Sequence, residues 1–169
     1  MCYDGDVIGP VEALELARQL HGDQVDKLGE NMVDGHLTRV QQAVKEYNDP
    51  ELSVAAALHD SLEDTDVTAM LLLQSGVSPQ ALNIIVIVSR RPGEKYDDYI
   101  HRIIAGGVLQ AVQLKIKDVQ DHLRPIPDNI DPGDAGIRSV ISLRSRYHRA
   151  LPLLERAARQ LEIVAQVRQ

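Results

Sequence analysis

Apolar side chains recur every three or four residues along most of the chain, which is the spacing of amphipathic helices. In residues 11–20 the stripe consists of Leu14, Ala17 and Leu20, and Pro10 stands just before it, where a helix start accepts proline. Further helices are predicted over residues 40–47, 51–62, 65–73, 81–89, 96–104, 108–123 and 137–167. The pattern therefore predicts an all-α fold.

Turn-forming residues set the predicted boundaries of these helices. Thr65 is expected to cap the helix that begins there, and the Ser-Pro pair at 78–79 opens the next one. Loops are expected over residues 90–94 and 125–136, where proline and glycine accumulate.

The apolar run at residues 84–88, Ile-Ile-Val-Ile-Val, suits either a strand or a buried helix. Its β-branched residues favour a strand. The sequence shows no second strand to pair with it, so we expect a buried helix.

The length and composition of the chain indicate one globular domain. It has 169 residues, of which 44% are hydrophobic, and no apolar run reaches the ~18 residues that a membrane helix needs. The first ten residues carry Asp4 and Asp6 and lack a signal-peptide pattern, and the single cysteine, Cys2, cannot form an internal disulfide. We expect one domain over residues 1–169, in the cytoplasm, with no membrane partner.

The formal net charge of −7 argues against a nucleic acid polymer as the partner, because phosphate contacts need a basic surface. The chain has no Trp or Phe and five Tyr, too few for a platform on which single strands stack. A small phosphorylated molecule remains a candidate ligand, because one metal ion and a few local Lys and Arg side chains can neutralise its charge. The sequence does not exclude that the protein forms a homo-oligomer.

A His-Asp pair, His59-Asp60, closes an apolar helical segment. Alone, such a pair is more often structural, but charged side chains are rarely buried unless they are paired or bind a metal. An imidazole nitrogen beside a carboxylate oxygen suits Mn²⁺, Fe²⁺ or Zn²⁺ better than Ca²⁺ or Mg²⁺. Glu63 and Asp64 follow these residues by four positions, so each would lie one helical turn away and could activate water or protonate a leaving oxygen.

Two residues do not close a metal site, and His36 and Asp118 are the best remaining candidates. His36 precedes a helix that carries Arg39, and the apolar residues around Asp118 indicate burial. Two His and two Asp would leave zero net charge around a divalent cation.

The order His, His-Asp, Asp resembles the HD superfamily of phosphohydrolases, and more closely its hydrolases of guanosine tetra- and pentaphosphate. The resemblance covers about residues 13–124 and implies a compact HD-domain helical bundle, with residues 137–167 as a C-terminal helical extension. It rests on Leu20-His21-Gly22-Asp23-Gln24 with Lys27 and Gly29, His36 with Arg39-Val40, Ala56-Ala57-Leu58-His59-Asp60 with Glu63-Asp64-Thr65, and Leu114-Lys115-Ile116-Lys117-Asp118.

The resemblance implies Mn²⁺-dependent hydrolysis of guanosine 3′,5′-bis(diphosphate) to GDP and pyrophosphate, with Fe²⁺ or Zn²⁺ as alternative metals. Lys27 and Arg39 would lie near substrate phosphate or an acidic neighbour, and His122, one turn after Asp118, is a further candidate for the pocket. By position, the metal ligands would be His36, His59, Asp60 and Asp118, and the catalytic residues would be Glu63 and Asp64.

The sequence departs from the family pattern at three places. The family usually has Pro-Tyr in place of Asn31-Met32 and Pro in place of Leu37, directly after the first ligand. It commonly has Asn in place of His122. These departures leave open an HD phosphohydrolase for another nucleotide or a phosphorylated dinucleotide, such as a dNTP, an NTP or NADPH. An alternative of another class is a non-catalytic metal-binding sensor or interaction module, which would not need an acidic pair at residues 63–64.

Other polar residues have both a structural and a functional interpretation. We expect His21 to be structural and His101 and His148 to be exposed. The basic stretch at residues 90–96 is either a surface turn or a wall of the pocket. Arg144, Arg146, Tyr147 and Arg149 would form a solvated or interfacial face, from which one residue could reach phosphate.

Overall fold

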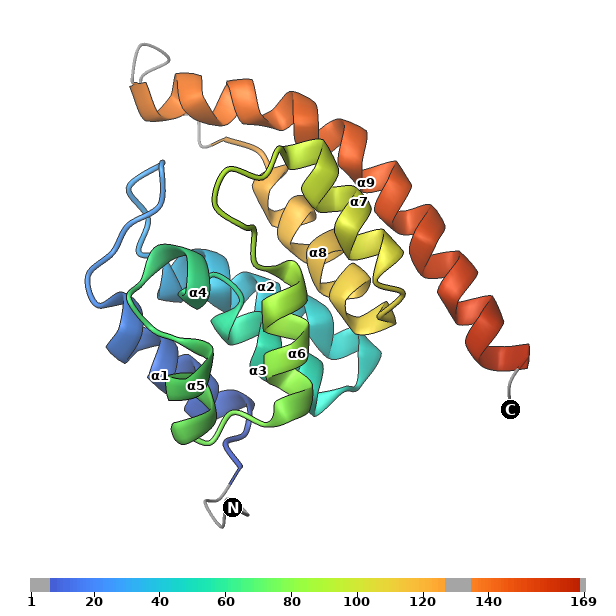
Figure 1. Ribbon diagram of the computed structural model, residues 1–169. Coiled ribbons are helices and arrows are strands. Elements are labelled where there is room, and N and C mark those ends of the chain that lie inside the picture. The colour runs from blue at the N-terminus through green and yellow to red at the C-terminus, as the bar shows by residue number, and fades with distance from the viewer. Residues whose placement is uncertain (1–6, 127–134, 168–169) are drawn as a thin grey trace.

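The computed structural model describes residues 7–126 and 135–167, and helices account for nearly all of its regular structure (Figure 1). Within these ranges β pairing amounts to one isolated antiparallel bridge, between Val25 and Asn31. The elements are α1 (Pro10–His21), a π-helical turn η1 (Val33–Leu37), α2 (Thr38–Val44), a 3₁₀ turn η2 (Lys45–Tyr47), α3 (Pro50–Leu58), α4 (Ser61–Asp64), α5 (Ala69–Gln74), α6 (Pro79–Val88), α7 (Tyr96–Ala105), α8 (Leu109–His122) and α9 (Ala135–Val167).

Helix α3 is the centre of the core. Every residue from Leu52 to Leu58 is buried, and the helix contacts α1, α2, α6 and α8. A helix that is apolar on all sides is stable only when other elements surround it. The C-terminal end of α3 therefore places the next two residues, His59 and Asp60, in the interior of the protein.

Helix α9 lies across α7 and α8 and continues beyond them at its C-terminal end (Figure 1). Apolar side chains that face the bundle fix this arrangement, among them Ala150 and Leu154, which are buried. Pro152 lies inside the helix. Because α9 crosses the end of α8, its first half stands over the residues that surround Asp118.

Two predicted helix boundaries are wrong. The helix predicted over residues 51–62 ends at Leu58, and a turn at residues 59–60 separates it from α4. Thr65 does not cap α5: its hydroxyl donates to the Ser61 carbonyl, and the backbone at Thr65 is extended. Thr68 is the N-cap, because its side chain accepts a hydrogen bond from the Leu71 amide.

Two other expectations for the fold are confirmed in the described residues. The run at residues 84–88 is helical, within α6, and the expected all-α class is observed. No helix in the described parts of the chain has both the length and the apolar character needed to cross a membrane. Cys2 and most of the loop expected over 125–136 lie outside the described residues.

Candidate metal centre

The turn at His59-Asp60 is held by backbone interactions that leave both side chains facing inward. The His59 ring donates from Nδ1 to the Ala56 carbonyl over 2.9 Å. The Asp60 carbonyl accepts hydrogen bonds from the amides of Glu63 and Asp64, at 3.0 and 2.9 Å, and so starts α4. This break in the helix places the imidazole and the carboxylate side by side, with His59 Nε2 3.3 Å from Asp60 Oδ1.

His36 reaches the same point from the π-helical turn η1. The Leu37 amide bonds to the Met32 carbonyl five residues earlier, and the Asn31 side chain caps the turn by accepting from the amides of Val33 and Asp34. Such turns are frequent at functional sites because they redirect a side chain out of the helical register. The His36 side chain is 3% exposed.

The four side chains expected as metal ligands converge in the structure, although they come from three separate parts of the chain. His36 Nε2 lies 3.3 Å from His59 Nε2, 3.5 Å from Asp60 Oδ2 and 3.4 Å from Asp118 Oδ1. His59 Nε2 lies 3.8 Å from the same oxygen of Asp118. Distances of this size are those between ligand atoms that surround one ion with bonds of about 2.0–2.2 Å.

The hydrogen bonds of the two imidazoles show what these atoms are suited to bind. His36 Nδ1 donates to Asp121 Oδ2 over 2.8 Å, and His59 Nδ1 donates to a carbonyl, so in each neutral ring Nδ1 carries the proton. The two Nε2 lone pairs then face each other and the Asp118 oxygen. A cation at this point resolves that repulsion, so the residues present fit a divalent metal.

The pKa values of the two imidazoles support this assignment. Burial opposes the charged form of His36, but hydrogen bonds to Asp118 and Asp121 and the charge of Asp60 raise its pKa to about 10. Burial also opposes the charged form of His59, but Asp60 and Asp118 raise its pKa. The carboxylates therefore make the site strongly favourable to positive charge.

Lys115 completes the surroundings of Asp118 and was not identified as a site residue from the sequence. Its ammonium lies 2.5 Å from Asp118 Oδ2 and 4.8 Å from the centre of the Tyr99 ring. Burial alone would raise the pKa of Asp118, but Lys115 and the imidazoles of His122 and His36 hold that pKa well below its usual range. Asp118 is therefore ionised, with Oδ1 left facing the three histidines.

Arg39, expected near phosphate or an acidic neighbour, has acidic neighbours. It pairs with Asp121 at 2.6 Å and with Glu30 at 2.8 Å, and Glu30 also pairs with Arg124. Arg39 lies outside the lining of the cavity described below. Its place in this network indicates that it orients Asp121, which in turn orients His36.

A cavity of about 440 Å³, within the range typical of small-molecule sites, is lined by three of the four converging side chains, His36, Asp60 and Asp118. Its cationic wall residues are Lys27, Arg90, Lys115, Arg124, Arg144 and Arg146. Its other wall residues are Gln24, Val25, Asp26, Leu28, Met32, His36, Asp60, Glu63, Asp64, Tyr96, Tyr99, Asp118, Asp121, His122, Ile126, Val140, Leu143 and Tyr147.

The two acids expected to be catalytic, Glu63 and Asp64, both lie in the cavity wall. Partial burial raises the pKa of Glu63, and the charge of Asp60 adds to this rise. Partial burial and Asp60 likewise raise the pKa of Asp64. Glu63 Oε1 accepts a hydrogen bond of 2.8 Å from the Arg90 amide, which fixes its position in the cavity wall.

Among the residues with open interpretations, Arg90, Arg144, Arg146 and Tyr147 line the cavity. Arg144 is held by the carbonyls of Leu123 and Arg124, each at 2.9 Å, and so ties α9 to the end of α8. Away from the cavity, His21 is buried and bonds to Gln24 and Ser61, Arg149 pairs with Asp97, and His101 and His148 are exposed.

The departures from the family pattern have different structural consequences. Met32 and His122 lie in the cavity wall, where they can affect a ligand. Asn31 caps η1, and Leu37 is fully buried in the core. Thus the changes at Asn31 and Leu37 concern the fold of the turn, and the changes at Met32 and His122 concern the cavity.

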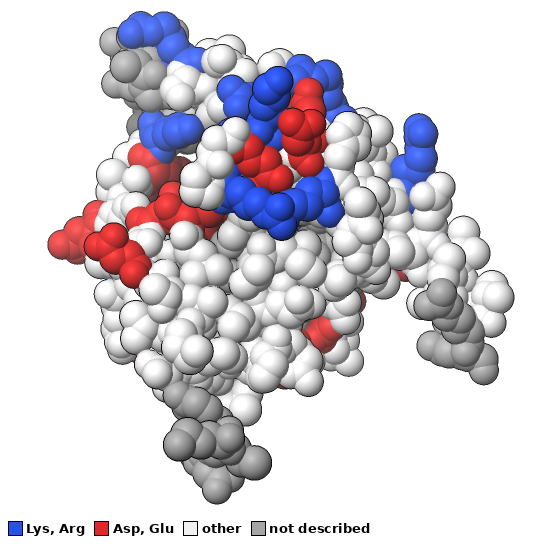
Figure 2. All heavy atoms as spheres, in the orientation of Figure 1, with Lys and Arg blue, Asp and Glu red and all other residues white. Residues whose placement is uncertain are grey.

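Charged side chains are distributed unevenly over the surface. Figure 2 shows basic side chains gathered around acidic ones on the upper half of the face, near the loop between α6 and α7, whereas the lower half is nearly free of charge. The lower half includes α5 and α6, and residues 67–89 contain no charged residue. On this face, charge is therefore concentrated around the loop between α6 and α7.

Comparison with known proteins supports the fold. No protein family and no curated protein matches the chain by sequence. Among solved structures, a metazoan ortholog of SpoT, described as hydrolysing ppGpp and acting in starvation responses, matches with a TM-score of 0.63. The match covers 90% of this chain and 92% of the other, at 19% sequence identity. The match agrees with the expected all-α fold, and the chain is similar in fold to this protein.

Proposed function

We propose that the protein is a metal-dependent phosphohydrolase that removes pyrophosphate from the 3′ position of guanosine 3′,5′-bis(diphosphate). The observation that carries the proposal is the convergence of His36 Nε2, His59 Nε2 and Asp118 Oδ1 within 3.8 Å of one another, with His36 and Asp118 in the wall of the cavity. The fold shared with a ppGpp hydrolase supports the same class of reaction.

The ligands of the metal would be His36, His59, Asp60 and Asp118. Mixed imidazole and carboxylate ligands suit Mn²⁺, and they also suit Fe²⁺ or Zn²⁺. When bound, such an ion acts as a Lewis acid towards a phosphoryl oxygen and lowers the pKa of water.

Glu63 and Asp64 would handle the protons of the reaction. Water adds to the phosphorus next to the ribose 3′ oxygen, the bond between them breaks, and the 3′ oxygen takes a proton. A carboxyl group whose pKa is raised towards neutrality can both accept a proton from water and donate one to a leaving oxygen. Glu63 is the better placed of the two, because the Arg90 amide fixes its carboxylate.

Cationic side chains of the cavity would hold the phosphates. Among the described residues, the ammonium of Lys27 has no ion-pair partner, and it lies in the cavity wall on the loop before η1. Arg146 also lies in the cavity wall, on α9, with its guanidinium 5.8 Å from the Tyr96 ring centre. These two charges are thus available to a ligand, whereas Lys115 is committed to Asp118.

A second candidate substrate is another nucleotide or a phosphorylated dinucleotide, such as a dNTP, an NTP or NADPH. Two wall residues favour this alternative: Met32 offers apolar contact without the hydroxyl of Tyr, and His122 is not the amide common in the family. A non-catalytic sensor is disfavoured, because a binding module has no need of Glu63 and Asp64 beside the metal.

A panel of substrates tests the proposal. The protein loaded with Mn²⁺ is incubated with guanosine 3′,5′-bis(diphosphate), ATP, dATP, GTP and NADPH, and phosphate and pyrophosphate are measured. We expect pyrophosphate from the first compound, with base selection weakened by about 1–3 kcal/mol relative to a site with Tyr in place of Met32. Met32→Tyr should then raise kcat/KM for that compound. Turnover of another compound alone would retain the reaction class and reject the alarmone.

A further inference from the structure

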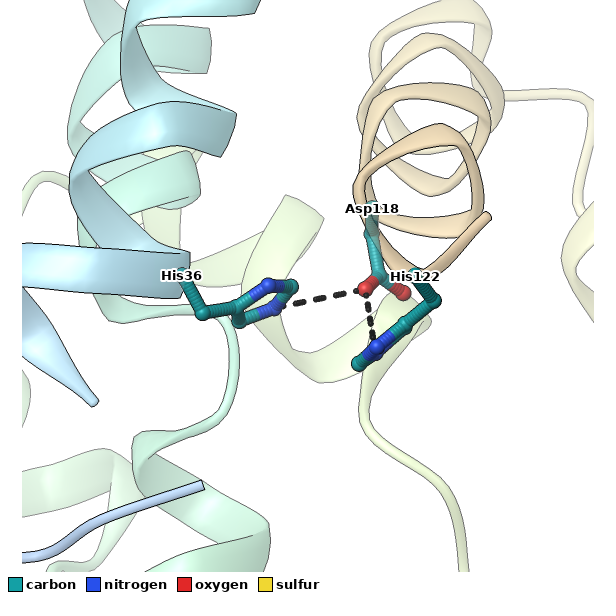
Figure 3. Close-up of side chains that lie close together, drawn as sticks. All are labelled: His36, Asp118 and His122. Atoms are coloured by element: carbon teal, nitrogen blue, oxygen red, sulfur yellow. Dashed lines mark ion pairs between the residues drawn. The ribbon is translucent and has the colours of Figure 1, made fainter. Parts of the chain in front are cut away.

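The imidazole of His122 lies against the metal centre, and none of the roles proposed above uses it as a ligand. Its Nε2 is 3.1 Å from Asp118 Oδ1, closer than the Nε2 of His36 at 3.4 Å. In Figure 3 the rings of His36 and His122 both point at this oxygen, one from η1 and one from the last turn of α8. The ligand atoms of His36, Asp118 and His122 all lie within 4.8 Å of one another.

Two aromatic contacts fix the plane of the His122 ring. It stacks on His36 with a centroid distance of 4.7 Å and an interplanar angle of 21°, and on Tyr147 at 5.0 Å and 8°. The ring is therefore held between η1 and α9 with its edge directed at Asp118. An exposed histidine without a role in binding does not need to be held on both faces.

The exposure of His122 distinguishes it from the other histidines of the site. Its side chain is 41% exposed and lies in the cavity wall, whereas His36 is 3% exposed and His59 is 4% exposed. Two sets of three donors share His36: one contains His59 and Asp60, and the other contains Asp118 and the exposed His122. His122 thus offers a donor on the side from which substrate enters.

We infer that His122 is a further metal ligand, which gives the centre a third imidazole on its cavity side. The inference rests on the metal centre of the proposed function. Imidazole favours Zn²⁺ and Fe²⁺, whereas carboxylate and water favour Mn²⁺. A site with three imidazoles and two carboxylates therefore binds Zn²⁺ and Co²⁺ more strongly, relative to Mn²⁺, than the four-ligand set does.

Binding measurements with the metals alone test the inference on the full chain. The variant His122→Asn removes the imidazole, and His101→Asn is the matched control on the exposed face of α7. Dissociation constants are measured for Zn²⁺, Co²⁺ and Mn²⁺, together with the visible absorption of the Co²⁺ form, which reports the ligand number. Removing a residue that only orients a metal ligand already costs ~10-fold or more in metal affinity. We therefore expect His122→Asn to lower the affinity for Zn²⁺ and Co²⁺ by at least ~10-fold and the affinity for Mn²⁺ by less. The absorption spectrum of the Co²⁺ form should also change.

A second variant, His122→Glu, replaces nitrogen by oxygen and should recover Mn²⁺ affinity while leaving Zn²⁺ affinity low. The control His101→Asn should match the unaltered chain in every measurement. If the unaltered chain binds one metal and His122→Asn binds all three ions equally well with the same spectrum, the inference is wrong and the proposed function stands. If the unaltered chain binds no metal, both are wrong.

Discussion

The Nδ1 nitrogen of His36 lies 2.8 Å from Oδ2 of Asp121, and this contact sets the tautomer that turns His36 Nε2 towards the metal centre. Asp121 is held in turn by Arg39, at 2.6 Å and 3.0 Å. Burial would raise the pKa of Asp121, but His36 and Arg39 lower it strongly, so the carboxylate stays charged.

Asp121→Asn should weaken metal binding by about 10- to 100-fold, the usual effect of removing a carboxylate that orients a histidine ligand. The fold should persist, because Asp121 is at the end of α8. Isothermal titration with Mn²⁺ measures the effect, and Asp97→Asn, on the exposed surface of α7, is the control. An unchanged affinity would show that Asp121 does not position His36.

Removing a ligand should have different consequences for His59 and Asp118. His59→Ala should lose bound metal and all activity while the metal-free fold persists. Asp118→Ala should also leave the Lys115 ammonium buried without its partner, at a cost of about 3–5 kcal/mol in the free energy of unfolding. Elemental analysis and denaturant unfolding of both variants check this, with the exposed His148→Ala as control. Metal retained by His59→Ala would contradict the assignment.

Glu63→Gln should keep the metal and the fold but lose turnover by about 10²- to 10⁴-fold, since a glutamine cannot transfer the proton. The amide oxygen can still accept the hydrogen bond from the Arg90 amide. Metal content and kcat of the purified variant are the two measurements. Metal lost along with activity would mean that Glu63 is a ligand.

The positions of the candidate ligands could be anticipated from the sequence, because His59-Asp60 are adjacent and close an apolar segment. The packing around these ligands could not be predicted from the sequence. The break at residues 59–60, which ends the helix predicted to run to Leu62, depends on backbone bonds that no periodicity reveals. As a result Glu63 and Asp64 sit on a new helix, α4, and both amides bond to the Asp60 carbonyl.

The contacts that support the ligands could not be predicted for a related reason. Asp121 and Arg39 are 82 residues apart in the sequence, and their contact depends on how α2 packs against α8. Asp121 could have been noticed as a carboxylate three residues after Asp118, on the same helical face. Tyr147 was expected on a solvated or interfacial face, but its contact with His122 could not be predicted, because only the crossing of α9 over α8 brings the two rings together.

Metal binding should release protons, and the apparent affinity should rise with pH. The pKa of His36, raised to about 10, means that its ring is protonated at pH 7 in the metal-free chain, and the pKa of His59 is raised as well. A metal needs both Nε2 atoms unprotonated, so binding expels the proton that His36 holds there. Titrations in buffers of different ionisation enthalpy measure the release, and a buffer-independent heat would contradict it.

The same raised pKa has a consequence for the metal-free fold. Charged His36 stabilises the folded state fully below its ordinary pKa of 6.5, and this contribution is lost as pH rises towards about 10. Thermal unfolding of the metal-free chain from pH 6 to pH 10 should therefore show falling stability. His36→Asn should flatten that dependence.

The most direct measurement is the release of pyrophosphate from guanosine 3′,5′-bis(diphosphate) by the chain, with and without Mn²⁺. If His36, His59, Asp60 and Asp118 form a catalytic metal centre, GDP and pyrophosphate appear in equal amounts, only when metal is present and not with His59→Ala. If the metal-loaded chain releases neither phosphate nor pyrophosphate from this compound or from any nucleotide of the panel, the protein is not a phosphohydrolase.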